Sequence, residues 1–224
     1  MEEKGLKSNV KWLNAYGITN AGTVYWNQTP AQLIEKALLN GEGHLADNGS
    51  ICCDTGKFTG RSPKDRFVVE DDKTRDTVWW GDINIPLSES NFDQILDKMV
   101  KNLEGKDLYV RDAYAGADKT YRLNLRVINT KAWHNLFCHN MFIRPSRYKL
   151  EKFDPNFTII CDPDFKADPK VDGTRQDNFA VINFSKRMIL IGGTAYAGEM
   201  KKGIFSVLNF LLPNDHNVLS MHCS

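Results

Sequence analysis

The sequence predicts an α/β fold of α+β character, in which helices pack on a mixed β-sheet. Of the 224 residues, 42% are hydrophobic and 25% are charged, as in ordinary globular proteins. Folding should bury about 70% of the surface that an unfolded chain of this size exposes, so a substantial hydrophobic core is expected. Strand-like and helix-like segments alternate without a strict β–α–β rhythm, which favours a mixed sheet over a purely parallel one.

The overall charge and the cysteine usage exclude several classes of protein. Lys and Arg number 29 against 28 Asp and Glu, a formal net charge of +1, so a generally basic nucleic-acid-binding protein is not expected. No apolar run approaches the ~18 residues of a membrane span, and residues 1–12 lack the apolar core of a signal peptide. The five cysteines form no C-x-x-C motif, which is typical of reduced, mostly buried thiols in a cytoplasmic protein.

The first clear element is a helix that begins after Thr29. Residues 1–25 show no regular pattern and are expected to lie over the rest of the fold. Thr29 can cap the helix, Pro30 suits its first position, and Gln32 completes a capping box. Gly41 provides the stop.

A second helix is marked by apolar residues at helical spacing, with Ser90 as the expected cap and Gly105 as the stop. These apolar residues are Phe92, Ile95, Leu96, Met99, Val100 and Leu103. Between the two helices, residues 50–53 and 67–69 are short apolar runs that predict strands. They flank a segment rich in Gly, Thr and charged residues, 54–66.

The second half of the chain contains further strands and helices. Apolar and polar residues alternate over 121–127, which predicts a half-exposed strand. Residues 132–142 are expected to be helical, and Arg144-Pro145 limits that helix. Residues 157–160 form another apolar run that predicts a strand.

The C-terminal part is expected to contain a hairpin, a helix and a last strand. Two apolar runs within 179–191 are joined by Ser-Lys-Arg, which predicts the hairpin. After Gly192-Gly193 a helix should start near Gly198, because apolar residues then recur on one face. A turn is expected at 213–215, and residues 218–224 should begin a strand.

Residues 55–66 form the first candidate functional segment. Gly56 and Gly60 allow backbone N–H groups to approach a ligand, and an Arg there can bind a carboxylate or phosphate through two hydrogen bonds. Its cations are Lys57, Arg61, Lys64 and Arg66. Because Gly56-Lys57 is followed by Phe58, the segment is not a Walker A loop. The alternative is a solvated hairpin that carries charged side chains.

The turn after Gly192-Gly193 is the second candidate segment. A strand that ends in glycines and leads into a helix is a favourable place for an anion. Lys201 and Lys202 near the start of that helix oppose its dipole unless an anion compensates, and such a local conflict is typical of functional sites. The alternative is that both are ordinary surface lysines of an amphipathic helix.

Other chemically active residues are better explained as structural. His134 and His139 are five residues apart, which puts them on different faces of a helix. We expect Cys52-Cys53 to fill the core and Asp71-Asp72 to form a solvated turn. His222 taken by itself is a core histidine, because nothing beside it has metal-ligand spacing.

Six motifs in order along the chain nevertheless point to one family. They are TGKFTGRSPKDRF (55–67), VWWGD (78–82), YAGAD (114–118), WHNLF (133–137), IGGT with YAGE (191–199), and SMHCS (220–224). Together they resemble the signature of ATP-dependent phosphoenolpyruvate carboxykinase, from about Tyr16 to the last residue. The resemblance implies that residues 1–224 adopt the N-terminal, substrate-side domain fold of that family.

The resemblance also implies an activity and cofactors. The family is a lyase and kinase of gluconeogenesis that converts oxaloacetate and ATP to phosphoenolpyruvate, CO₂ and ADP, with Mn²⁺ or Mg²⁺. By position, Arg61 resembles the arginine that holds the substrate carboxylate, and Tyr196 resembles the tyrosine of the substrate site. Lys201 resembles the lysine beside the transferred phosphate of ATP. Lys202 and His222 resemble the two nitrogen ligands of the metal, and are therefore expected to lie close together. The resemblance also places both residues at the ATP phosphate and Lys202 at the substrate.

The resemblance ends before the nucleotide site. Family members continue past the segment that matches 220–224 into a nucleotide-binding loop and a metal-binding aspartate. We therefore expect the C-terminal nucleotide-binding domain to be absent from this chain, which would then be a fragment or one half of a split enzyme and inactive alone. The alternative is a non-catalytic carboxylate-binding or interaction module.

Overall fold

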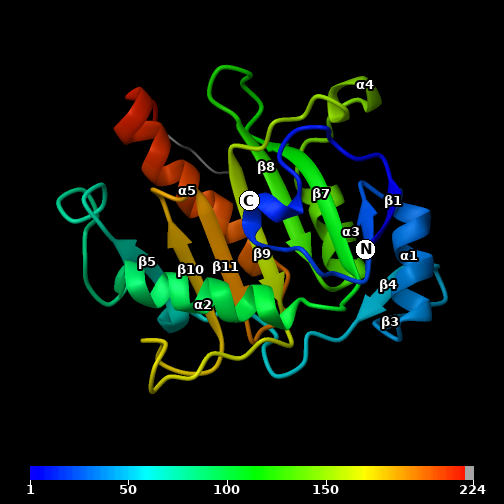
Figure 1. Ribbon diagram of the computed structural model, residues 1–224, viewed down its shortest axis with the longest axis horizontal. Helices are drawn as coiled ribbons and strands as arrows, with labels where there is room; N and C mark the ends of the chain where they lie inside the picture. The colour runs from blue at the N-terminus through cyan, green and yellow to red at the C-terminus, as the bar shows by residue number, and fades with distance from the viewer. Residues whose placement is uncertain (220–224) are drawn as a thin grey trace.

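A nine-stranded mixed sheet forms the centre of the molecule (Figure 1), as the sequence predicts. The structure is a computed structural model that describes residues 1–219. In spatial order the strands of the sheet are β1 (Glu2–Gly5), β2 (Thr23–Trp26), β7 (Leu108–Ala115), β8 (Leu123–Asn129), β9 (Phe157–Asp162), β11 (Met188–Gly192), β10 (Phe179–Asn183), β5 (Arg66–Glu70) and β6 (Ile85–Ser88). A separate antiparallel pair consists of β3 (Gly43–Leu45) and β4 (Ile51–Cys53).

Parallel and antiparallel pairings coexist in the sheet. β7 pairs antiparallel with β8, and β10 pairs antiparallel with β11. The second pair is the predicted hairpin, with Val181 opposite Leu190. The remaining neighbours in the order are parallel. As a result, β5 is joined through β10 to β11, which brings the segments that follow residues 53 and 192 to the same region of the sheet.

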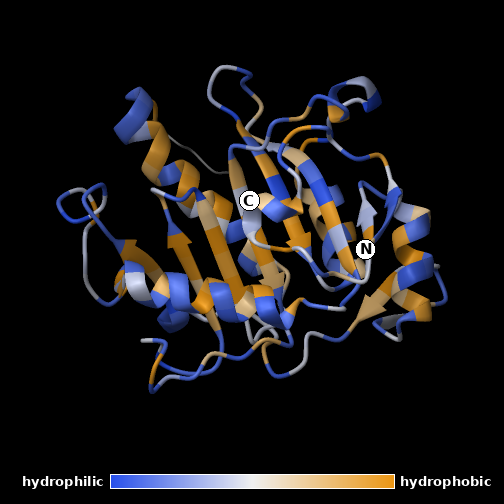
Figure 2. Cartoon of the chain, viewed as in Figure 1, coloured by the Kyte–Doolittle hydropathy of each residue, from blue (hydrophilic) through white to orange (hydrophobic). Residues whose placement is uncertain are grey.

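Helices cover both faces of the sheet. They are α1 (Pro30–Leu39), α2 (Glu89–Asn102), α3 (Ala132–Met141), the short α4 (Arg147–Leu150) and α5 (Gly198–His216), with 3₁₀ turns η1 (Leu13–Tyr16) and η2 (Pro63–Asp65). The apolar face of α2 packs with one set of strand residues, and α3 and α5 pack with the other. Figure 2 shows the strands as largely hydrophobic and the outer helical surfaces as mixed. No described helix has the length and apolar character needed to cross a membrane.

The predicted helix signals are mostly confirmed. The hydroxyl of Thr29 and the side chain of Gln32 form the expected capping box of α1, with Pro30 in the first turn. The cap of α2 is Ser88 rather than Ser90, because the Ser88 hydroxyl accepts the hydrogen bond from the Asn91 backbone N–H at 3.1 Å. The helix therefore begins two residues earlier than the predicted cap indicates.

Several strand predictions need correction. The N-terminal segment, expected to be irregular over residues 1–25, contains β1 at the edge of the sheet and most of β2 beside it. β7, which the sequence did not predict, is buried along its length. β8 is not half-exposed, since it lies between β7 and β9 with both faces covered. Its polar residue Arg126 is 0% exposed.

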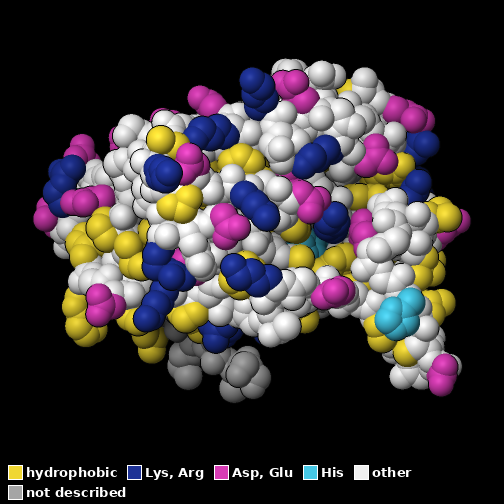
Figure 3. Space-filling view, turned by 90° about the horizontal axis from the view of Figure 1, so that it is seen from below, with side chains coloured by type: hydrophobic (Ala, Val, Ile, Leu, Met, Phe, Trp, Pro, Cys, Tyr) yellow, Lys and Arg dark blue, Asp and Glu magenta, His cyan; other side chains and the backbone are white. Residues whose placement is uncertain are grey.

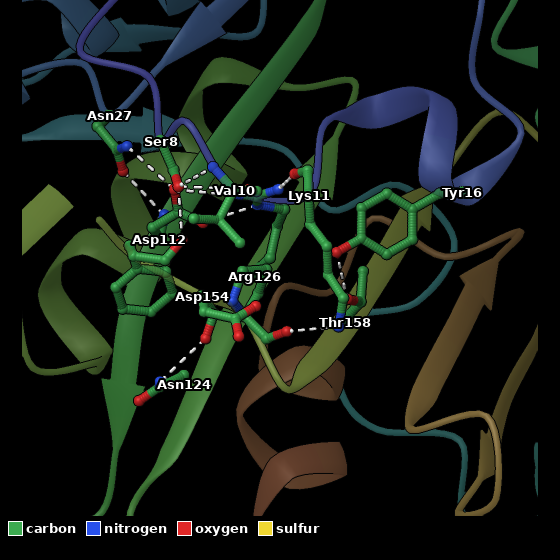
Figure 4. A network of polar contacts seen from close by, with 12 residues as sticks. Ser8, Val10, Lys11, Tyr16, Asn27, Asp112, Asn124, Arg126, Asp154 and Thr158 are labelled. Carbon is green, nitrogen blue, oxygen red and sulfur yellow. Dashed lines mark hydrogen bonds and ion pairs between the residues drawn. The ribbon is translucent and has the colours of Figure 1, made fainter. Parts of the chain in front are cut away.

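The burial of Arg126 is possible because its charge is paired (Figure 4). Its guanidinium donates to the Asp112 carboxylate of β7 at 2.8 and 3.1 Å, and it also donates to the backbone carbonyl of Lys11. Asn27 donates to the same carboxylate at 3.5 Å, and Tyr16 accepts a hydrogen bond from Thr158 of β9 at 3.1 Å. The N-terminal segment thus covers a buried ion pair.

The C-terminal helix is longer than expected. α5 runs through Pro213 to His216, so residues 213–215 do not form a separate turn. Asn217, whose φ of 53° is left-handed, caps the end of the helix, and the Val218 N–H donates to the Leu212 carbonyl at 3.0 Å. Residues 218 and 219 are not in a strand, and the rest of the predicted strand, 220–224, lies outside the described residues.

Two further expectations are wrong. Cys52 is exposed and does not fill the core, because β4 belongs to the small outer pair of strands; Cys138 and Cys161 are buried. Asp71 is buried, and its carboxylate accepts hydrogen bonds from the Ser185 hydroxyl at 2.6 Å and from the Thr74 N–H at 3.0 Å. Only Asp72 of that pair is solvated.

Candidate functional site

The charged loop before β5 is attached to the start of α5 by one buried carboxylate. Glu199, in the first turn of α5, is 3% exposed. It accepts a hydrogen bond from the Ser62 backbone N–H at 2.8 Å and forms an ion pair with Arg66 at 2.9 Å. Arg66, one of the cations that the sequence assigned to an anion site, is therefore used to hold the loop in place.

The same loop is fixed at η2 by a second carboxylate. The Arg175 guanidinium binds the buried Asp65 side chain through two hydrogen bonds of 2.9 and 2.8 Å. Gln176 donates a third to the same carboxylate at 2.7 Å. Two separate contacts thus position the residues between Thr55 and Asp65, although their own backbone is irregular.

The turn between β11 and α5 requires its glycines. Gly193 has a φ of +68°, and a Cβ atom there would lie 2.7 Å from the backbone of Asn178. A Cβ atom on Gly198 would overlap the ring of Tyr196. Glycine at these positions therefore lets Tyr196 lie directly over the beginning of the helix.

A buried histidine holds the segment that precedes Tyr196. His134 of α3 is 0% exposed, and burial lowers its pKa to about 4. It is therefore neutral near pH 7, and its Nε2 lies 2.8 Å from the Ala195 carbonyl, to which an Nε2–H donates. This contact agrees with the structural role expected for His134.

These contacts create an open cleft of about 390 Å³ between the loop, α3 and α5. Its lining consists of Thr55, Arg61, Trp133, Phe137, Met141, Tyr196, Ala197, Gly198, Lys201 and Lys202. The structure thus brings together Arg61, Tyr196, Lys201 and Lys202 from segments that are far apart in the sequence. The fifth predicted site residue, His222, lies outside the described residues, so its expected proximity to Lys202 stays a prediction.

The cations of the cleft have no internal counter-charge. Across residues 1–219, no carboxylate lies within ion-pair distance of Arg61, Lys201 or Lys202. The Lys202 amine lies 4.5 Å from the centre of the Phe205 ring. Three unpaired cations near a helix N-terminus are suited to an anionic ligand such as a carboxylate or phosphate.

On the face seen in Figure 3, the positive charges do not form one continuous surface. In the view from below, Lys and Arg side chains are interspersed with Asp and Glu (Figure 3). In the described part of the chain, no group of three His, Cys, Asp or Glu side chains could hold a metal ion. Lys202 is the one predicted metal ligand that the structure describes.

Sequence reasoning missed two parts of this site. Trp133, Phe137 and Met141 form an apolar wall, and their four-residue spacing places them on one face of α3, a signal that the sequence contains. Glu199 belongs to the YAGE motif, but the sequence predicts no role for it. Its anchoring role depends on contacts with Ser62 and Arg66, which no local pattern reveals.

Comparisons with known proteins identify the family of this chain. The family profile described as phosphoenolpyruvate carboxykinase matches residues 22–224. A protein of Amoebophilus asiaticus named phosphoenolpyruvate carboxykinase (ATP) is 52% identical over 216 residues, which are 96% of this chain and 42% of that protein. The protein of the same name from Christiangramia forsetii is 54% identical over 212 residues, 95% of this chain and 40% of the relative. Phosphoenolpyruvate carboxykinase (ATP) 2 of Moorella thermoacetica is 50% identical over 216 residues, 96% and 41% of the two chains.

These matches are nearly complete for this chain but partial for the relatives. They cover nearly all of this chain but only about two-fifths of each relative's length. The matched profile includes every described residue of the cleft, from Thr55 to Lys202. With a profile match over most of its length and relatives at about 50% identity, this chain belongs to the phosphoenolpyruvate carboxykinase family.

Proposed function

We propose that this chain provides the substrate-binding part of an ATP-dependent phosphoenolpyruvate carboxykinase. One observation supports the proposal most directly: Arg61, Lys201 and Lys202 meet in one cleft beside Tyr196, and none has a carboxylate partner among the described residues. Oxaloacetate, phosphoenolpyruvate and ATP are all anions. Such a cleft compensates their charge without first having to break an internal ion pair.

The reaction requires this kind of cleft at two stages. In oxaloacetate the bond to the departing carboxylate breaks, CO₂ leaves, and the electron pair forms an enolate oxygen. That oxygen attacks the γ-phosphorus of ATP, and the bond to the ADP oxygen breaks, giving phosphoenolpyruvate. Arg61 would hold the substrate carboxylate in a planar two-point contact, while Tyr196 would position the substrate. Lys201 would lie beside the transferred phosphoryl group and reduce its charge.

The proposed cofactors are ATP and a divalent cation, Mn²⁺ or Mg²⁺. Lys202 and His222 would hold the cation, which when bound supplies positive charge at the enolate oxygen. An amine binds a metal only in its deprotonated form, so Lys202 would act as a neutral ligand toward the metal and as a cation toward an anion. The side chains of Arg61, Lys201 and Lys202 suit the anionic phosphates of ATP. Metal ligands other than Lys202 would come from outside residues 1–219.

We further propose that residues 1–224 form the N-terminal domain of the enzyme. The part of the relatives that this chain does not span would then contain the nucleotide-binding domain, and the chain alone would show no turnover. The free thiols of the described cysteines agree with a cytoplasmic location. Oxaloacetate, phosphoenolpyruvate and ATP would be the small-molecule partners.

Calorimetric titration of the chain with oxalate tests the binding proposal. Oxalate is a stable dicarboxylate that resembles the enolate of the reaction. Arg61→Met should weaken its binding more than tenfold, because a neutral thioether cannot pair with a carboxylate. Lys57→Met is the matched control, since Lys57 is an exposed cation of the same loop that does not line the cleft. Equal binding by both variants would contradict the proposal.

A chimera separates this function from the alternative, a non-catalytic binding module. The chain would be joined to the remaining part of the Christiangramia forsetii relative, with which it shares 54% identity. Metal- and ATP-dependent release of CO₂ from oxaloacetate by the chimera, and none by the chain alone, is the expected result. A chimera that folds and binds oxalate but lacks turnover would favour the binding module.

A further inference from the structure

Arg111 is a buried cation that has no counter-charge among the described residues. Arg111 of β7 is 5% exposed, and its nearest acidic neighbour in sequence, Asp112, is paired with Arg126. Within residues 1–219, Arg111 forms no ion pair; its Nε donates to the Asn135 side-chain oxygen at 3.1 Å and its Nη2 to the Gln28 carbonyl at 2.5 Å. A buried cation with neutral partners alone is unfavourable, because desolvation is not compensated.

Polar atoms without partners lie beside this cation. The Asn135 side-chain nitrogen and the His139 Nδ1 are both buried and make no hydrogen bond within the described chain. Asn135 and His139 are one helical turn apart on α3, so they share a face of that helix. Arg144 is also close, since its guanidinium donates to the His139 carbonyl at 3.2 Å. An unsatisfied buried polar group is unfavourable, and a bound ligand that pairs with it would remove that cost.

The electrostatic environment around these atoms is positive. Burial lowers the pKa of Arg111 to about 10, so it stays charged near pH 7. Burial, followed by Arg111 and Arg144, lowers the pKa of His139 to about 4, so the ring is neutral and one of its two nitrogens carries a hydrogen. Arginine and amide N–H groups without a carboxylate form a donor set that is complementary to an anion.

We propose that Arg111, Asn135 and His139 bind one small inorganic anion, such as chloride, between β7 and α3. A small anion suits the place because Arg111 already uses two of its nitrogens, which leaves Nη1 and the two orphaned side-chain nitrogens. The site is distinct from the cleft, since Trp133 and Phe137 line the cleft from another face of α3. Bound there, the anion neutralises the buried cation and stabilises the packing of α3 on the sheet.

Thermal unfolding tests this proposal with chloride as the probe. Sodium gluconate is exchanged for sodium chloride, so that the ionic strength stays constant while the chloride concentration changes. Raising chloride from 1 to 100 mM should raise the Tm of the chain by about 3 °C, if the dissociation constant is about 10 mM. Arg111→Met and Asn135→Leu should each lose this response. Arg147→Met, which removes an exposed cation without a carboxylate partner, should retain it. A response of the same size in all four proteins would overturn the proposal.

Crystals grown in sodium bromide give a second readout that does not depend on the variants folding. An anomalous peak within hydrogen-bond distance of Arg111 and Asn135 is the expected result, because bromide replaces chloride and scatters anomalously. An ordered water at that position without anomalous signal would overturn the proposal, since it would show that the orphaned atoms are satisfied by solvent alone.

Discussion

Charged side chains are treated in opposite ways in two regions of this molecule. Under the N-terminal segment, Asp112 and Arg126 are each 0% exposed at their side chains and bind each other through two hydrogen bonds. In the cleft, Arg61, Lys201 and Lys202 are accessible and have no carboxylate partner among the described residues. In the first region the charged groups are paired with each other, whereas in the second their hydrogen-bond donors are available to a ligand.

The difference separates charges that support the fold from charges that are available to a ligand. A buried pair contributes to stability only while both members are present, since one remaining charge would be desolvated without compensation. An exposed, unpaired cation contributes little to stability and keeps its donors for an anion. Substitutions in the first region should therefore change unfolding, and those in the cleft should change binding and catalysis.

The largest effect is expected for Asp112→Ala, which leaves Arg126 buried and unpaired. The free energy of unfolding should fall by about 3–5 kcal/mol, as measured by urea denaturation. Asp76→Ala is the control, because Asp76 is exposed and forms no ion pair within residues 1–219. A loss of less than 1 kcal/mol for Asp112→Ala would show that the pair does not stabilise the fold, and the comparison would break down.

Acidification should have the next largest effect, through His134, which connects the core to the segment before Tyr196. Its pKa is about 4 in the folded chain against about 6.5 when unfolded. Between these values the unfolded state binds more protons, so stability falls as the pH is lowered from 6.5 to 4. The contribution is about 3 kcal/mol. In urea denaturation between pH 7 and 4, His134→Gln should lose less stability than the unsubstituted chain by about that amount. If the unfolding free energies of the two proteins changed equally with pH, His134 would not be neutral and buried in the folded chain.

Glu199→Gln tests a buried charge that belongs to both the fold and the binding site. Glu199 is buried, yet it positions the loop that carries Arg61 by contacts with Ser62 and Arg66. Removing its charge should cost about 2 kcal/mol of unfolding free energy and should also weaken oxalate binding. If stability falls while oxalate affinity is unchanged, the loop is positioned without this carboxylate.

The smallest effect on stability is expected for Arg61→Lys. The free energy of unfolding should stay within about 0.5 kcal/mol, as for other surface substitutions. In the chimera, kcat/KM for oxaloacetate should nevertheless fall more than tenfold, because lysine cannot form the planar two-point contact. A stable variant with unchanged kcat/KM would place Arg61 outside the substrate site.

Local signals in the sequence predicted the helices better than the strands. The Thr29 capping box and the helix after Gly198 depend on neighbouring residues, so the sequence contains the whole signal. β7 was missed because Arg111 and Asp112 interrupt its apolar pattern, and β8 was assigned an exposed face because of Arg126. Both strands are buried because partners from distant segments satisfy these charges.

By itself, the sequence determined the mixed α/β class, the hairpin, the family resemblance, and the identity of Arg61, Tyr196, Lys201 and Lys202 as candidates. Each depends on residue types and on spacing along the chain. Only the tertiary structure decided that these four line one cleft, that Arg66 is engaged by Glu199, and that Arg111 is buried without a counter-charge. The physical reason is that pairing and burial of a charge depend on which distant segments the sheet brings side by side. The order β11–β10–β5 sets that arrangement through non-local hydrogen bonds.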